Sequence, residues 1–174
     1  MDEKRALLRH FLAALAYRTQ KALRGAPLEF GTFSAADGVR TPIQLVRHMT
    51  SVLGYARAFF VGGQYRPDPL PSLEEEAARF HEMLEDLARY LQGGAPVLEG
   101  MSAERLLQGP FSDAMTHAGQ LAMLRRLAGA PVAPENFIVA DIDADRCGRR
   151  QADPVSPDES WPEAPPGWVP PSRR

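Results

Sequence analysis

Residues 109–129 read GPFSDAMTHAGQLAMLRRLAG, and this stretch decides the fold. After the proline, apolar residues recur at helical spacing until a glycine closes the run, which is typical of a helix with one buried face. Asp113 and His117 are four residues apart and lie on that face, which continues with Leu121, Leu124 and Ala128. The stretch therefore predicts a helix that carries an acid and an imidazole toward the core.

Three other stretches have the same amphipathic character. The four predicted helices span residues 2–23, 41–61, 72–92 and 102–128. Pro42 directly after Thr41 marks a helix start, and Ser72 with Glu75 forms a capping box. Gly109 and Pro110 predict a break inside the fourth helix. Four such segments joined by loops predict an all-α, antiparallel four-helix bundle, in which only the loop 25–40 has room for an extended piece.

Composition narrows the class of protein. The 174 residues suit one domain, and 20 Lys and Arg against 22 Asp and Glu give a net charge of -2, so nothing indicates nucleic-acid binding. Cys147 is the single cysteine, which excludes an internal disulfide and a cysteine-rich zinc site. The charged start MDEKRALLRH is unlike a signal peptide, and no run approaches the roughly 20 apolar residues of a membrane helix. We therefore expect a cytoplasmic protein without a membrane partner.

The last quarter of the chain differs from the rest. Residues 130–174 are rich in proline and lack a helical period, so they predict irregular chain. Apolar side chains nevertheless recur there, including Phe137, Ile138, Trp161 and Trp168. We expect residues 1–129 to form the helical bundle, and residues 130–174 to pack on it as an extended tail that is not a separate domain.

Three side chains stand out as metal ligands. Asp113 and His117 share one inward face, and His48 lies on the apolar stripe of another predicted helix. Burying a carboxylate is costly unless a cation compensates it, and ligands from two facing helices can hold one ion. Two simpler interpretations stay open: an ion pair between Asp113 and His117, and a hydrogen-bonded core role for His48. His10 and His81 have no such pattern and are interpreted as structural or surface residues.

Two stretches resemble the DinB/YfiT-like family of metal-binding four-helix bundles. Residues 41–56, TPIQLVRHMTSVLGYA, look like the second helix of that family, and residues 109–129 are similar to its last helix through an H-x-G-Q-L element. Residues 134–148, PENFIVADIDADRCG, look like an extension found in one branch. The resemblance covers about residues 2–129 and implies an up-up-down-down bundle with a long crossover between the second and third helices.

The same resemblance implies a divalent metal ion. Family members hold the ion with a histidine of the second helix and two groups four residues apart on the last helix, which correspond here to His48, Asp113 and His117. Nickel or zinc is the common ion. This chain departs from the commoner pattern because Asp113 stands where a third histidine is usual, and a set of two histidines and one carboxylate also suits iron or manganese.

The implied activity is metal-dependent chemistry on a small molecule. Related proteins include thiol-dependent transferases and isomerases that use low-molecular-weight thiols. The leading hypothesis for this chain is a metal-dependent thiol S-transferase or hydrolase, in which the ion activates a thiol or a water. The alternative is a non-catalytic, stress-related protein that binds a metal or ligand and uses the ion structurally. The sequence identifies no catalytic residue. A homodimer is also expected, with Tyr17, Met83 and Tyr90 as candidate interface residues.

The side chains near the three ligands are harder to interpret from sequence. Gln44 and Gln120 are each within four residues of a candidate ligand and are interpreted either as groups that orient it or as ordinary surface amides. Tyr55 is either a substrate contact or a core residue. Arg125 and Arg126 either lie on a solvated face or attract an anionic substrate.

Overall fold

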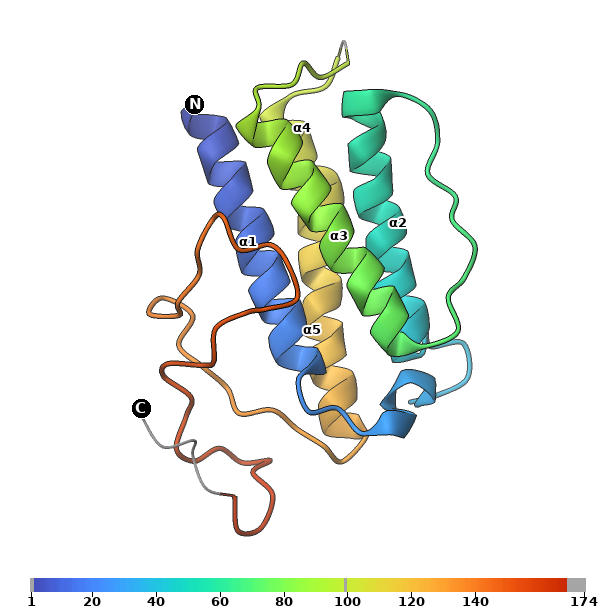
Figure 1. Ribbon diagram of the computed structural model, residues 1–174. Coiled ribbons are helices and arrows are strands. Elements are labelled where there is room, and N and C mark those ends of the chain that lie inside the picture. The colour runs from blue at the N-terminus through green and yellow to red at the C-terminus, as the bar shows by residue number, and fades with distance from the viewer. Residues whose placement is uncertain (1, 99, 169–174) are drawn as a thin grey trace.

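The computed structural model describes residues 2–98 and 100–168, in which four long helical segments pack side by side (Figure 1). The segments are α1 (Glu3–Leu23), α2 (Pro42–Val61), α3 (Leu73–Gln92), and a composite of α4 (Ala103–Leu106), a π-helical turn (Leu107–Phe111) and α5 (Ser112–Leu127). None of these helices is long and apolar enough to cross a membrane. The prediction of an all-α fold is thus confirmed for the described residues.

The ends of the helices follow local sequence signals. Thr41 and Gln44 form a capping box at the start of α2, and Ser72 and Glu75 form one at the start of α3. The predicted break lies at Gly109, whose φ of -94° and ψ of -106° are not helical, next to Pro110. These signals are short-range, so the helix bounds could be predicted to within a residue or two.

The relative directions of the helices differ from the predicted ones. Near the start of α1, Lys4 pairs with Glu104 of α4, and near its end the carbonyl of Ala22 accepts a hydrogen bond from Arg125 of α5. Hence α1 and α5 are parallel. The helices α2 and α3 are parallel as well, because Arg47–Glu76 and Phe60–Tyr90 contacts link their corresponding ends.

Because α1 and α2 run in opposite directions, the order of directions is up-down-down-up, and the predicted up-up-down-down order is wrong (Figure 1). The neighbouring pairs α1–α3 and α2–α5 are antiparallel, whereas α1–α5 and α2–α3 are parallel. The parallel directions of α2 and α3 follow from the crossover that joins them, residues 62–72. A 20-residue helix is about 30 Å long, and eleven extended residues span up to about 36 Å. This crossover is long enough to return the chain to the end at which α2 began, so α3 runs in the same direction as α2. The long crossover itself was expected.

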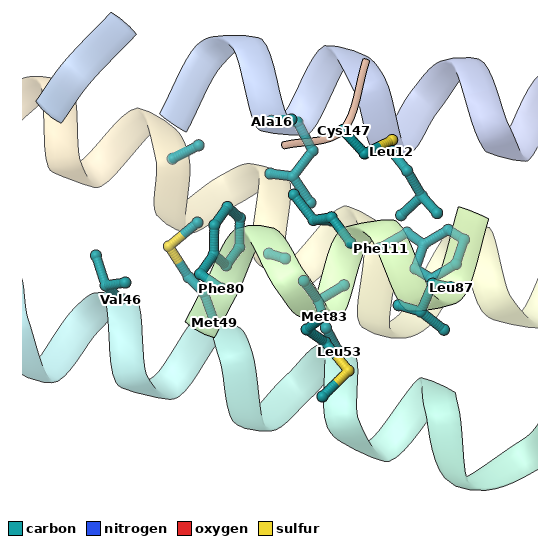
Figure 2. Close-up of a cluster of buried hydrophobic side chains, with 14 of the residues drawn as sticks. Leu12, Ala16, Val46, Met49, Leu53, Phe80, Met83, Leu87, Phe111 and Cys147 are labelled. Carbon is teal, nitrogen blue, oxygen red and sulfur yellow. The ribbon is translucent and has the colours of Figure 1, made fainter. Parts of the chain in front are cut away.

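A single core lies between the helices (Figure 2). Figure 2 shows Leu12 and Ala16 of α1 with side chains of α2, α3 and the composite segment. The hydrophobic side chains that α2 buries in this core are Leu45, Val46, Met49, Leu53 and Ala56. On the stripe predicted to face inward, Leu45 is buried as expected. His48, Val52 and Phe59 of the same stripe lie at the edge of the core and are only half-buried, and Tyr55 beside it is exposed. Site residues on this stripe are thus accessible from solvent.

The segment between α1 and α2 contains a 3-10 helix, Leu28–Thr32, rather than an extended piece. The side chain of Phe30 is buried against the core and under the guanidinium of Arg125. Burial of this ring explains why a compact turn forms here in place of an extended chain.

The tail packs along α1 and across α3 (Figure 1). The carboxylate of Glu135 accepts a 2.8 Å hydrogen bond from Tyr17, and Asp153 pairs with Arg24. Cys147 is buried within the helical core (Figure 2), and Trp161 is also buried. The described part of the tail is therefore attached at several points, whereas residues 169–174 lie outside the described part of the chain.

Two residues proposed for a dimer interface are part of the protomer's own interior. Tyr17 and Met83 are 1% and 5% exposed, and the ring of Tyr90 stacks on Phe60. These residues face inward because the tail and α2 cover the corresponding sides of α1 and α3. The expected homodimer remains a prediction, but it needs another surface.

Candidate metal centre

The three predicted ligands come together between α2 and α5. One ligand atom from each of His48, Asp113 and His117 lies within 4.8 Å of the other two. Nε2 of His117 is 3.3 Å from Oδ1 of Asp113, and the ring centroids of His48 and His117 are 4.8 Å apart with their planes at 71°. Within residues 2–98 and 100–168, no other three His, Cys, Asp or Glu side chains form such a group.

The break before α5 positions two of the ligands. Because the chain is not helical at Gly109, a new helix begins at Ser112 and Asp113 falls in its first turn. The positive end of a helix stabilises a carboxylate there. His117 follows one turn later, so both side chains leave the same side of α5.

His48 comes from the second turn of α2, whose start is fixed by the capping box at Thr41. Partial burial lowers the pKa of His48, and the positive charge of Arg40 lowers that pKa further. Asp113 acts in the opposite direction, but its effect on the pKa is smaller. His48 is therefore held in the neutral form, which is the form that coordinates a metal ion.

A hydrogen bond sets the orientation of the second imidazole. Nδ1 of His117 lies 2.8 Å from Oε1 of Gln120, so the ring donates its Nδ1 proton to the amide oxygen. That tautomer leaves the lone pair of Nε2 on the side of Asp113. Amides and carboxylates in this position commonly fix the ring orientation and tautomer of metal-binding histidines, and Gln120 is placed to do the same for His117.

The spacing of these groups fits a divalent ion. Donors about 2.1 Å from a tetrahedral ion are about 3.4 Å from one another, and the 3.3 Å between Nε2 of His117 and Oδ1 of Asp113 is close to that value. The side chain of Asp113 is about half exposed, whereas that of His117 is 11% exposed. The three side chains therefore lie at a solvent-accessible edge of the core, and an ion held by them would keep coordination positions for water or another molecule.

The other candidate side chains have separate roles. The side-chain oxygen of Gln44 accepts the Thr41 amide proton in the capping box. His10 is exposed, as expected. Arg125 is buried and donates to backbone carbonyls at the end of α1, while Arg126 pairs with Glu163 of the tail. Both arginines thus have partners at the opposite end of α5 from Asp113.

One polar cluster was missed by sequence reasoning. His81 of α3 is 1% exposed, and its Nδ1 lies 2.9 Å from the carbonyl oxygen of Cys147 in the tail. Burial lowers the pKa of His81 to about 4 and raises that of the Cys147 thiol to about 11. The path of the tail creates this contact, and no local pattern near either residue indicates it.

No family model, no curated protein and no solved structure matches this chain.

Proposed function

We propose that this protein is a DinB-like metalloprotein that binds one divalent ion through His48, Asp113 and His117. The observation that carries this proposal is the convergence of these three side chains from two helices. The donor set of two imidazoles and one carboxylate suits zinc or nickel, and also iron or manganese. The long crossover between α2 and α3, and the positions of the ligands on the second and last long helices, agree with the family resemblance.

The proposed activity is that of a metal-dependent thiol S-transferase or hydrolase acting on a small molecule. A bound divalent ion lowers the pKa of a coordinated thiol or water, which gives a nucleophile at neutral pH. The chain supplies a neutral His48, a His117 oriented by Gln120, and a half-exposed Asp113 that leaves one side of the site open. A low-molecular-weight thiol is the proposed cosubstrate.

The alternative is a protein in which the ion is structural and links α2 to α5. A closed coordination sphere of four or more protein ligands would support that alternative, whereas the exposed edge at Asp113 favours an open site. X-ray absorption of the loaded protein distinguishes the two, because an open site shows oxygen donors beyond the three protein ligands. These donors should be replaced by sulfur when the thiol binds.

Metal titration tests the proposal directly. Protein purified without an affinity tag should bind about one equivalent of Zn²⁺ or Ni²⁺, and His117→Ala should lose tight binding. The matched control is His10→Ala, which removes an exposed histidine elsewhere on the chain and should leave affinity unchanged. Equal affinity in the two variants would exclude this site. A thiol-transfer assay with the loaded protein then separates the catalytic from the structural alternative.

A further inference from the structure

A pocket of about 480 Å³ lies at the far end of α2 from its capping box, where this helix, the crossover and the α3–α4 loop meet. Tyr55 and Phe59 of α2 form one wall, and Leu98 forms another. Tyr55 is seven residues after His48, so it lies on the same side of α2 about 10 Å along the axis. The pocket is therefore separate from the metal centre, and its volume is within the range of small-molecule sites.

Large apolar groups face this pocket without a protein partner that covers them. Tyr55 is 61% exposed and Leu98 is 53% exposed, although burial of such large side chains is energetically favourable. The rings of Tyr55 and Phe59 pack against each other in a T shape, with their centroids 4.8 Å apart and their planes at 78°. The exposed ring of Tyr55, with Phe59 and Leu98 near it, therefore offers an apolar face on which a flat molecule can stack.

The shape of the pocket is fixed by the chain around it. The amide of Leu98 donates a 2.8 Å hydrogen bond to the carbonyl of Phe59, which holds this loop on the end of α2. On the crossover side, the ring of Tyr65 rests directly on Gly54, where no other residue would leave it room. Binding would thus require little reordering of the walls, which reduces its entropic cost.

Two glycines form the turn at the edge of the pocket. Gly62 and Gly63 line it with φ values of 76° and 75°, a backbone conformation that favours glycine. A Cβ built at either position would meet nothing within 4 Å, so the space beside them is open. The crossover therefore begins with a turn that borders the pocket without filling it.

One charged group lines the pocket. Arg66 forms no ion pair or hydrogen bond with any other residue in the described part of the chain. The C-terminal end of α2 carries a partial negative charge of about one half, which is smaller than the full positive charge of Arg66. One of the carbonyls at that helix end, that of Phe59, already accepts a hydrogen bond from the amide of Leu98. The balance of charge in the pocket therefore favours an anionic group on the ligand.

We propose that this pocket binds a small organic anion with a flat apolar body, which stacks on the ring of Tyr55, contacts Phe59 beside it and places its acidic group at Arg66. The ligand class is defined by these two features: fused or linked rings, and one carboxylate, sulfonate or phosphate. The site is additional to the metal centre and does not depend on the function proposed for it.

Two fluorescent probes that share one apolar body test the proposal. The anion 8-anilinonaphthalene-1-sulfonate carries the acidic group, and N-phenyl-1-naphthylamine is the same ring system without it. Both are titrated against the full chain with EDTA present, so that the result is independent of the metal centre. We expect one tight site for the sulfonate, with affinity lowered about tenfold by Arg66→Gln and also lowered by Tyr55→Ala.

The neutral probe should lose affinity in Tyr55→Ala but not in Arg66→Gln. Arg150→Gln, which removes an exposed arginine of the tail, and Leu28→Ala, which removes a fully exposed leucine, should leave both affinities unchanged. Tyr55 and Arg66 are both exposed, so their variants should fold. Unchanged sulfonate binding in either Tyr55→Ala or Arg66→Gln would overturn the proposal, as would equal losses for both probes in Arg66→Gln.

Discussion

Two glutamine side chains lie near the proposed ligands, and the structure gives them different tasks. Gln120 accepts the Nδ1 proton of His117, whereas Gln44 completes the capping box of α2. Gln120→Ala should therefore weaken metal binding by roughly 10- to 100-fold, because the ring of His117 is no longer held. Gln44→Ala should instead lower the free energy of unfolding slightly and leave metal affinity unchanged.

Competition with a chelating dye measures the affinities, and urea unfolding of the metal-free protein measures the stabilities. Similar metal affinities in the two variants would show that Gln120 does not orient His117.

His81 gives the fold a specific dependence on pH. Burial lowers its pKa in the folded state from an ordinary value of 6.5 to about 4, so the unfolded chain takes up a proton more readily than the folded one. Above about pH 6.5, His81 is neutral in both states and does not reduce the free energy of unfolding. As pH falls from 6.5 toward 4, protonation of the unfolded chain lowers the free energy of unfolding by about 3 kcal/mol in total.

The variant His81→Asn keeps a donor for the Cys147 carbonyl but does not titrate in this range. Urea unfolding at pH 7 and pH 4.5 should show a smaller loss of stability for His81→Asn than for the natural chain. His10→Asn, at an exposed site, should retain the natural loss. An equal loss in all three proteins would contradict the assignment to His81.

The site residues that could be predicted from sequence were those defined by local spacing. Asp113 and His117 are linked by one helical turn, and the burial of their face follows from the apolar residues that continue it. The contact of His81 with Cys147 has no such signal, because it joins residues 66 positions apart through an irregular segment. The pocket at Arg66 was missed for the same reason, since three separate segments form it.

At the scale of elements, the crossover of residues 62–72 determines how α3 follows α2. Tyr65 lies on Gly54, the amide of Leu70 donates to Glu76, and Arg79 donates to the carbonyl of Asp68. The carboxylate of Glu76 is fully buried and also pairs with Arg47. These contacts hold the crossover against both helices and keep α2 and α3 parallel.

Two helix glycines test the crossover contact. A Cβ at Gly54 would lie 2.1 Å from the ring of Tyr65, whereas a Cβ at Gly119 would meet nothing within 4 Å. Gly54→Ala should lower the free energy of unfolding by about 1–3 kcal/mol, because the ring must move. Gly119→Ala, in the interior of α5, should raise it by up to about 1 kcal/mol, because alanine has the higher helix propensity.

A double variant confirms the cause. Tyr65→Ala removes the ring that the new methyl group meets, so the cost of Gly54→Ala should become much smaller in the Tyr65→Ala background. A cost that is the same in both backgrounds would mean that the ring is not responsible.

Helix positions and helix directions differ in how far sequence determines them. Caps such as Ser72 with Glu75 act within one turn, and they were predicted correctly. The directions depend on whether a loop returns along the bundle, which is decided by contacts such as that of Tyr65 with Gly54. Those contacts join distant parts of the sequence, so helical periodicity carries no information about them.

At the scale of the whole molecule, the tail completes a core that the helices leave open. Cys147 is 3% exposed and Trp161 is 8% exposed, and Tyr17 and His81 meet the tail through hydrogen bonds. Without the tail, these two polar groups and the apolar surface beneath would face water. The tail contacts lie on α1, on α3 and at the last turn of α5, whereas the proposed metal centre lies between α2 and the first half of α5.

A chain ending at Gly129 should therefore be less stable but should keep the proposed metal site. Burial of one large apolar side chain contributes roughly 1.5–3 kcal/mol, and the tail buries at least Cys147 and Trp161, so a loss of several kcal/mol is expected on urea unfolding. The single variant Trp161→Ala should show a smaller loss in the same direction, and it serves as the test if the shortened chain does not fold.

In Trp161→Ala, Zn²⁺ affinity should equal that of the natural chain, because the proposed ligands and Gln120 are unchanged. If both altered proteins unfold at the same urea concentration as the natural chain, the tail contributes nothing to the core; if Trp161→Ala loses metal affinity, the tail supports the metal centre from a distance.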